Sequence, residues 1–256
     1  PGMAGAAFLS ACAAYTVGAG LVQIYTASEN RLALQELLPE AIISCYDSYD
    51  DSQLSHLLDW ADVVCIGCGL GMGQISEKIL ENVLKNVSCP CVIDADGLNL
   101  LSRNIELLNQ CCAPVILTPH MKEMSRLTGW SIDTIMEDRF QALDQIIKQS
   151  GPDTKSSIIC VLKDSRTVVA QTNRQKFVNL AGNNSMAKGG SGDVLAGTIA
   201  GLLAQHMAPF EATTVGVFLH ACGGDEAKKS KGSYSVLARD LIQGMADAMK
   251  NAKECR

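Results

Sequence analysis

The chain has 256 residues, of which 47% are hydrophobic and 19% are charged, and its formal net charge is −6 at pH 7. This composition is typical of a globular protein and excludes an intrinsically disordered chain. The negative charge argues against nucleic acid and acidic membrane surfaces as partners. No apolar run reaches the roughly 18 residues that a membrane-spanning helix needs, so we expect no membrane partner.

The 11 cysteines are odd in number and irregularly spaced, unlike the framework of a short secreted disulfide-rich protein. We therefore expect a cytoplasmic, reducing location and thiols that are mostly buried under a sheet. Cys65 and Cys68 have CxxC spacing, and Cys89 and Cys91 lie near another strand. A zinc site would need a second well-spaced pair or nearby histidines, so no metal-ligand set is predicted.

The first part of the chain alternates helices with short apolar strands. Helices are expected at 4–16, 29–38, 52–60, 76–85, 121–127 and 132–149, and strands at 21–26, 41–45, 62–66, 91–94 and 114–117. Such alternation predicts βαβ units and a parallel sheet, and continuous apolar strands are typical of a sheet buried on both faces.

The pattern changes after residue 150. Strands expected at 157–162, 167–170 and 176–178 follow one another through tight turns, which favours antiparallel pairing, and helices are expected at 192–205, 209–228 and 236–250. No linker, repeat or low-complexity tract interrupts the chain. We therefore expect one α/β domain over residues 1–256, with a mainly parallel central sheet, antiparallel edge strands and a helical C-terminal layer.

The segment most suited to chemistry runs from Asn183 to Asp193 and reads Asn-Asn-Ser-Met-Ala-Lys-Gly-Gly-Ser-Gly-Asp, directly before a helix. Gly189, Gly190 and Gly192 let backbone amides approach a ligand, and the helix N-terminus adds free N–H groups and partial positive charge. This combination predicts a phosphate site, although it is neither a Walker A loop nor a G-x-S-x-G elbow. Asp193 is then either a base acting on an acceptor hydroxyl or simply a helix cap.

A second glycine-rich turn, Ile66-Gly-Cys-Gly-Leu-Gly-Met-Gly, follows a strand and precedes a helix. Met72 occupies the place of the last glycine of G-x-G-x-x-G, so the dinucleotide fingerprint fails by one position. Gly69 and its neighbours either line a ligand at the end of a strand or serve only the turn.

Two acids, Asp94 and Asp96, follow the next strand. They either bind a metal–phosphate group through water or cap the following helix. His120 follows a strand and a proline turn at the same expected sheet edge, which favours ligand contact over a purely structural role. Lys163 ends a strand before a polar turn, and either contacts a phosphate or nucleobase or belongs to a surface hairpin. His220 lies on an apolar helix and is expected in the core.

Five motifs in this order resemble the NAD(P)H-hydrate dehydratase family of the ribokinase-like superfamily: G-x-G-L-G, V-I-D-A-D-x-L-N, L-T-P-H-x-x-E, V-L-K-x-x-x-T and N-x-x-M-A-K-G-G-S-G-D. The resemblance extends from about Gly5 to the helix that begins near Leu237. It implies a ribokinase-like three-layer α/β/α sandwich. It also implies an enzyme that dehydrates the S epimer of hydrated NADH or NADPH (NADHX or NADPHX), with ADP or ATP as phosphate donor. The K-G-G-S-G-D loop implies that ADP is preferred, and Mg²⁺ is expected to neutralise the phosphates.

The resemblance also assigns residues to roles. Asp193 is the catalytic acidic residue next to the hydrated ring, and Ala6, Gly69 and His120 line the hydrated dinucleotide together with it. The nucleotide is assigned to Lys163, Asp164, Ser165, Arg166, Thr167, Gly189, Gly190 and Gly192. The implied chemistry is phosphoryl transfer to the ring hydroxyl, followed by elimination of phosphate.

The chain departs from the family in two places. Cys68 stands where the family usually has proline, and family members begin with a further strand and glycine-rich turn before the position of Met3. The chain is therefore expected to start within the domain and to lack its N-terminal strand. The epimerase domain fused to many bacterial members is not present in this sequence, so a separate epimerase is an expected pathway partner.

The family resemblance suggests a homo-oligomer. The small residues Gly197 and Gly201 allow close helix packing, either within one subunit or between two. Two alternative functions are a small-molecule kinase of the same superfamily and a nucleotide-binding protein with impaired catalysis. A kinase leaves a stable phosphorylated product, whereas the dehydratase leaves NAD(P)H and free phosphate.

Overall fold

The computed structural model describes residues 2–148, 157–172, 174 and 176–254. The chain divides into two compact units. The first unit comprises Pro1–Cys45 and Asn179–Arg256, and the second comprises Tyr46–Val178.

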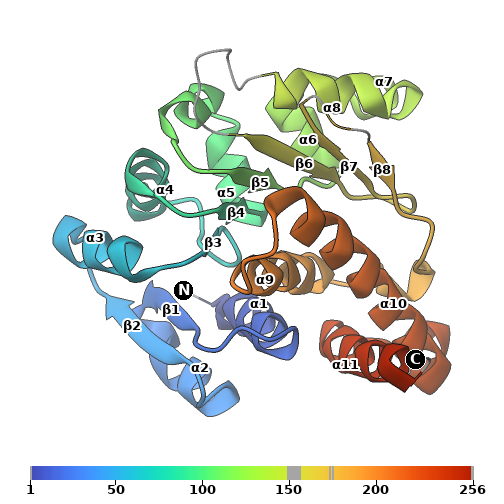
Figure 1. Cartoon of the computed structure of the whole chain (residues 1–256). Helices are drawn as coiled ribbons and strands as arrows, with labels where there is room; N and C mark the ends of the chain where they lie inside the picture. The colour runs from blue at the N-terminus through green and yellow to red at the C-terminus, as the bar shows by residue number, and fades with distance from the viewer. Residues whose placement is uncertain (1, 149–156, 173, 175, 255–256) are drawn as a thin grey trace. The chain divides into compact units, whose positions relative to one another are not determined.

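The second unit is built on a six-stranded sheet with the strand order β3-β4-β5-β6-β7-β8 (Figure 1). Its strands are β3 (Val64–Ile66), β4 (Cys91–Ile93), β5 (Val115–Leu117), β6 (Ile158–Leu162), β7 (Val168–Gln171) and β8 (Phe177–Val178). The first four are parallel, with Ile66, Ile93, Leu117 and Cys160 in register, and β7 and β8 pair antiparallel. The predicted parallel sheet with an antiparallel edge is confirmed.

Helices connect and cover these strands. They are α3 (Asp51–Trp60), α4 (Gln74–Asn86), α5 (Ala95–Leu101), η2 (Ile105–Gln110), α6 (Met121–Thr128), α7 (Ile132–Glu137) and α8 (Arg139–Ile147). Parallel crossovers are right-handed, and the strand order does not reverse from β3 to β6, so the three crossovers lie on one face of the sheet. All residues of β4, β5 and β6 are buried, which is why these strands read as continuous apolar runs.

One helical expectation in this unit is wrong, and one helix had no predicted bounds. The single helix expected at 132–149 is broken at Asp138, whose side chain accepts from the Gln141 N–H and so caps α8; the expected end at Gln149 lies outside the described residues. The helix that Asp94 or Asp96 could cap was given no bounds, and the structure places it as α5. Gly97 lies inside α5, although glycine is unfavourable within a helix. A Cβ there would approach Ile93 Cγ2 to 2.9 Å, so packing requires this glycine.

The first unit is mainly helical. Its elements are α1 (Ala4–Thr16), β1 (Gln23–Ala27), η1 (Ser28–Asn30), α2 (Arg31–Leu37), β2 (Ile42–Tyr46), η3 (Asn184–Met186), α9 (Ser191–Leu203), α10 (Pro209–Ser235) and α11 (Ala238–Glu254). Strands β1 and β2 form a separate two-stranded sheet, although their pattern predicted membership of the parallel sheet. The regular part of α10 ends before Gly232, which has a φ of 74°.

Helices α1 and α9 pack closely within this unit. A Cβ on Gly197 would lie 1.9 Å from the Ser10 carbonyl oxygen, and one on Gly201 would lie 2.6 Å from the Ala14 carbonyl oxygen. The small-residue face of α9 is therefore used inside one chain. A second contact set joins α9 to α10 and α11 through buried residues that include Val194, Ala227 and Met245.

The ten cysteines in the described part of the chain are free thiols. Cys91, Cys111 and Cys160 are buried, Cys112 is exposed, and the others are half-buried, so the expectation that most thiols are buried is wrong. Burial raises the pKa of the Cys91 thiol well above its usual value, which makes it a weak nucleophile. Among the described residues, no helix combines the length and apolar character needed to cross a membrane.

Candidate functional site

Glycines and polar residues follow the carboxyl ends of β3, β4, β5 and β6 in the second unit. The turn after β3 contains Gly67, Gly69 and Gly71, with φ values of 116°, 74° and 83°. A Cβ on Gly67 would lie 1.8 Å from the Asp94 carbonyl oxygen, so this turn requires glycine there for conformation and for space. Gly69, expected to line a ligand, is half-buried in this turn.

Lys163, at the end of β6, lies between two buried carboxylates. Its Nζ donates to Asp94 Oδ1 at 2.6 Å and lies 3.9 Å from Glu123 Oε2, and the Asp94 and Glu123 side chains are 2% and 5% exposed. Burial alone lowers the pKa of Lys163, but the two carboxylates outweigh burial and raise that pKa. Burial raises the pKa of Glu123, and the nearby Lys163 ammonium opposes this shift. In this unit the ammonium is therefore engaged by carboxylates.

Neither acid of the Asp94–Asp96 pair behaves as a simple helix cap. Asp94 is the first residue before α5, but its carboxylate makes no capping bond with the described residues and instead accepts from Lys163. Asp96 accepts from the Gly71 N–H at 2.8 Å, so it fixes the glycine turn. The expected contact with a metal–phosphate group stays a prediction.

His120 is the N-cap of α6. Its Nδ1 accepts from the backbone N–H groups of Lys122 at 3.0 Å and Glu123 at 3.3 Å, while Glu123 Oε2 accepts from the His120 N–H at 2.8 Å. Nδ1 is thus an acceptor, so the ring proton of neutral His120 resides on Nε2. Burial, with the nearby Lys163 ammonium, lowers the pKa of His120. The ring is 49% exposed, with Nε2 3.4 Å from Glu123 Oε1.

The turn after Lys163 carries the other residues assigned to the nucleotide in this unit. Asp164, Ser165 and Arg166 are exposed on the β6–β7 hairpin. Asp164 forms an ion pair with Arg139 at 3.0 Å, and Thr167 Oγ1 donates to the Asp164 carbonyl at 3.2 Å. The hairpin also meets the turn after β5, because the Lys163 N–H donates to the Pro119 carbonyl at 2.8 Å. His120 and Lys163 therefore share one sheet edge.

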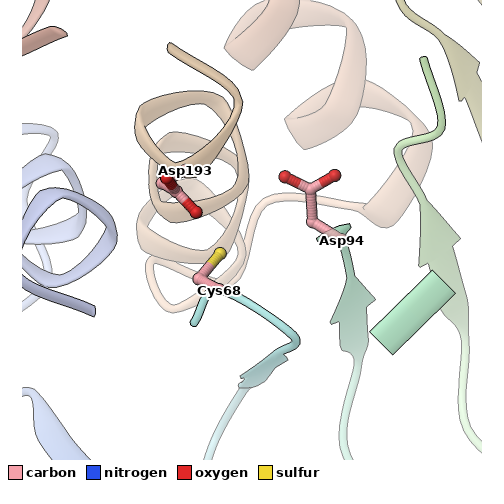
Figure 2. Close-up of side chains that lie close together, drawn as sticks. All are labelled: Cys68, Asp94 and Asp193. Atoms are coloured by element: carbon pink, nitrogen blue, oxygen red, sulfur yellow. The ribbon is translucent and has the colours of Figure 1, made fainter. Parts of the chain in front are cut away.

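The first unit contains the glycine-rich loop that leads into α9. Gly190 is the N-cap of α9 with a φ of 89°, and no side chain among the described residues caps this helix. A Cβ on Gly189 would have no atom within 4 Å, so the backbone at Gly189 is open. Asp193 lies in the first turn of α9, and Figure 2 labels it together with Cys68, which follows β3, and Asp94, which follows β4. An uncapped helix start with open glycine backbone suits an anion.

Residues that the sequence reasoning placed elsewhere also contact this loop. His220 is buried in α10 as expected, but its Nε2 lies 3.3 Å from the Ser191 hydroxyl at the start of α9. The Lys188 ammonium donates to the Tyr234 carbonyl at 3.2 Å. The only sequence signal for the contact between His220 and Ser191 was the presence of a histidine on an otherwise apolar helix. Ala6, assigned to the substrate, lies half-buried in the first part of α1.

Comparison with known proteins gives a consistent result. A family model described as NAD(P)H-hydrate dehydratase matches residues 1–246. The chain is 34% identical over 262 residues to the bifunctional NAD(P)H-hydrate repair enzyme Nnr of Moorella thermoacetica, covering 99% of this chain and 48% of that protein. It is 36% identical over 255 residues to the ADP-dependent (S)-NAD(P)H-hydrate dehydratase of Neisseria meningitidis, covering 98% of this chain and 82% of that protein. The chain spans about half the length of most of the curated relatives that it matches.

Solved structures of related proteins resemble this chain over nearly its whole length. The ADP/ATP-dependent NAD(P)H-hydrate dehydratase of Bacillus subtilis, co-crystallised with ATP and Mg²⁺ and soaked with CoA, has a TM-score of 0.81 and 28% identity, over 97% of this chain and 87% of that chain. A Thermotoga maritima ribokinase, at 14% identity and a TM-score of 0.55 over 93% of this chain and 86% of that one, shares the fold alone. The expected α/β class, with a mainly parallel sheet, helical layers and a ribokinase-like fold, is confirmed. The motifs, the fold and the match over residues 1–246 together show that this chain belongs to the NAD(P)H-hydrate dehydratase family.

Proposed function

We propose that this protein dehydrates the S epimer of NADHX or NADPHX back to NADH or NADPH and uses a nucleotide, with ADP preferred to ATP, as phosphate donor. The observation that carries the proposal is the glycine loop before α9, with its uncapped helix start and Asp193 in the first turn. Relatives named for this activity supply the reaction.

The residues of the loop suit a phosphate donor. The backbone at Gly189 is open, and the N–H groups at the start of α9 can donate hydrogen bonds to phosphate oxygens. The partial positive charge at this helix start also attracts a phosphate. Gly190 and Gly192 complete this proposed phosphate cradle. The proposal keeps Lys163 to Thr167 as the other nucleotide segment and Ala6, Gly69 and His120 as substrate residues.

The proposed reaction has two steps, phosphoryl transfer and elimination. Asp193 accepts the proton of the hydroxyl on the hydrated nicotinamide ring while that oxygen forms a bond to the terminal phosphorus of ADP or ATP, which leaves AMP or ADP. The ring C–O bond then breaks and its electron pair leaves with the phosphate. The neighbouring ring carbon gives its proton to the departing phosphate, and the electrons of that C–H bond form the ring double bond. Phosphorylation matters because phosphate is a far better leaving group than hydroxide.

A magnesium ion suits the same loop, because it prefers oxygen ligands and the Asp193 carboxylate lies in the first turn of α9. When bound, Mg²⁺ neutralises charge on the phosphates. The proposal also includes a single functional domain over residues 1–256, a homo-oligomer, a cytoplasmic location and a separate epimerase that supplies the S epimer.

The test incubates the protein with an epimer mixture of NADHX, Mg²⁺ and either ADP or ATP. Return of NADH absorbance and release of phosphate are measured together, with Asp193→Asn as the comparison. We expect recovery of NADH that depends on nucleotide, is faster with ADP and falls by about a hundredfold or more in Asp193→Asn.

Nucleotide consumption that yields a stable phosphorylated product, with no return of NADH, would instead identify a kinase. Nucleotide binding without any turnover would identify a binding protein. Either outcome would overturn the proposed dehydratase activity.

A further inference from the structure

The glycine loop before α9 is anchored to the middle of α10 by a carboxylate. Asp225 Oδ1 accepts from the Asn183 side-chain amide at 2.7 Å, and Asp225 Oδ2 accepts from the Gly182 backbone N–H at 3.2 Å. Hydrogen bonds to an ionised acceptor are stronger than those between neutral groups. One side chain of α10 thus fixes two successive residues at the entry to the loop.

Asn183 connects Asp225 to the turn that follows, η3. Its Oδ1 accepts from both the backbone N–H and the hydroxyl of Ser185, which is 3% exposed. The amide orientation is therefore fully determined, because the nitrogen faces a carboxylate and the oxygen faces two donors. The backbone then continues through Lys188 N–H to Met186 carbonyl at 2.8 Å and Ser191 N–H to Lys188 carbonyl at 3.2 Å.

Packing reinforces the same anchor. Met186 lies so close to α10 that a Cβ on Gly224 would come within 2.3 Å of its sulfur, and a Cβ on Gly182 would come within 3.1 Å of it. The glycine that precedes Asp225 therefore admits Met186, while Asp225 holds the residues before it. A loop supported in this way by both packing and ionic hydrogen bonds is pre-organised for its ligand.

We infer that Asp225 and Asn183 are positioning residues that hold the Gly189–Asp193 loop in the conformation that accepts the phosphates of a nucleoside diphosphate or triphosphate. This inference rests on the proposed function. Neither residue has to touch the nucleotide: both act through the backbone between Asn183 and α9. Replacing Asp225 or Asn183 weakens nucleotide binding, because the Gly189–Asp193 loop is then less ordered before binding. Ordering it on binding reduces the net free energy of binding.

A reciprocal exchange of the two side chains provides the test. Asp225→Asn alone loses one of the two bonds in either orientation of the new amide, because its nitrogen then faces either the Asn183 amide nitrogen or the Gly182 N–H. Asn183→Asp alone sets two carboxylates against each other. The double variant Asn183→Asp/Asp225→Asn restores every bond: the new amide donates to the new carboxylate and accepts from Gly182, while Asp at 183 still accepts from Ser185. Glu226→Gln is the matched control, because it removes the same charge from the next residue, where Glu226 pairs with Lys229 on the surface.

The affinity of the full chain for ADP with Mg²⁺ is measured by calorimetry, and the melting temperature is measured without nucleotide. We expect each single variant to raise the Kd by about tenfold, which is the scale of one lost ionic hydrogen bond. The Kd of the double variant should return to within about threefold of the wild-type Kd, since the exchanged side chains form the hydrogen bonds again. Turnover at saturating nucleotide should change little in all of them, which separates positioning from catalysis.

Wild-type affinity in Asp225→Asn would overturn the inference. If a single variant does not fold, the double variant decides: recovered folding with recovered ADP binding supports the inference, and failure of either overturns it. Failure of the proposed function is recognised separately, as a wild-type chain that binds no nucleotide, or that binds ADP but returns no NADH.

Discussion

The Lys163 ammonium lies 2.6 Å from Asp94 Oδ1 and so joins the end of β6 to the end of β4, across the intervening strand β5. The two residues are 69 positions apart in the sequence. Their side chains are 17% and 2% exposed, and Glu123 lies on the other side of the ammonium. One cation thereby links the ends of β4 and β6 to the first turn of α6.

Replacing Lys163 with methionine leaves two buried carboxylates without their cation. We expect the free energy of unfolding at neutral pH to fall by about 3 kcal/mol, because removing one partner of a buried pair leaves an uncompensated charge. Urea unfolding measures this change. Lys85→Met, in an exposed pair with Glu81, is the control and should change stability by no more than about 0.5 kcal/mol. Equal losses in the two variants would contradict the buried-pair argument.

Stability should depend on pH through His120. Burial lowers its folded-state pKa, and the Lys163 and Arg126 charges lower it further, while Asp94 and a backbone hydrogen bond oppose the shift. The unfolded chain therefore binds the proton more readily, so stability is lost as the pH falls from the ordinary histidine value of about 6.5 through the lowered pKa. The raised pKa of Glu123 acts in the opposite direction at lower pH, since protonation then favours the folded state. Wild type should lose stability relative to His120→Asn between pH 7 and the lowered pKa of His120, and parallel pH profiles would contradict this.

The two nitrogens of His120 have separable roles. Asparagine at this position places an acceptor where Nδ1 lies and keeps the cap of α6, whereas glutamine places a donor near Nε2 and loses the cap. We expect His120→Gln to destabilise the protein by about 1 kcal/mol and His120→Asn to be nearly neutral for stability. The proposed dehydratase activity should show the reverse order, with the larger loss in His120→Asn. Nitrogen chemical shifts of the wild-type ring should identify the neutral form protonated on Nε2.

Gly67 should tolerate no side chain. Its φ of 116° and the 1.8 Å approach of a Cβ to the Asp94 carbonyl oxygen mean that Gly67→Ala forces the backbone apart. We expect a loss of at least about 3 kcal/mol or failure to fold. Gly73→Ser is the matched control in the same turn, since a Cβ there meets no atom within 4 Å and serine is a favourable N-cap for α4. A stable Gly67→Ala variant would disprove the close approach.

Gly189→Ala tests whether a ligand approaches the open backbone of the glycine loop. A Cβ there meets no protein atom within 4 Å, so the melting temperature should stay within about 2 °C of the wild type. If phosphate occupies that space, the affinity for ADP should fall by about tenfold or more, as titration calorimetry would detect. Unchanged ADP affinity would place the phosphates away from Gly189.

The elements that could be predicted from sequence are those with an unbroken local pattern. The apolar runs of β4, β5 and β6 and the small-residue helix α1 match their predicted positions within a few residues, because burial on both faces leaves a continuous signal. Helix α5 contains a residue whose identity is explained by packing against distant parts of the chain. The bounds of α5 were not predicted; Gly97 lies inside this helix because Ile93 and Gly67 lie against it.

Residue types at close spacing are enough to identify the family, the α/β class, most of the strands along the chain and the two glycine turns. Only the tertiary structure decided which distant groups meet: Lys163 with Asp94, Asp96 with the Gly71 amide, and Asp225 with Asn183. The physical reason is that a charge or amide shows only that it needs a partner. Which partner it obtains depends on strand order and helix packing, and these are set by the burial of the whole chain.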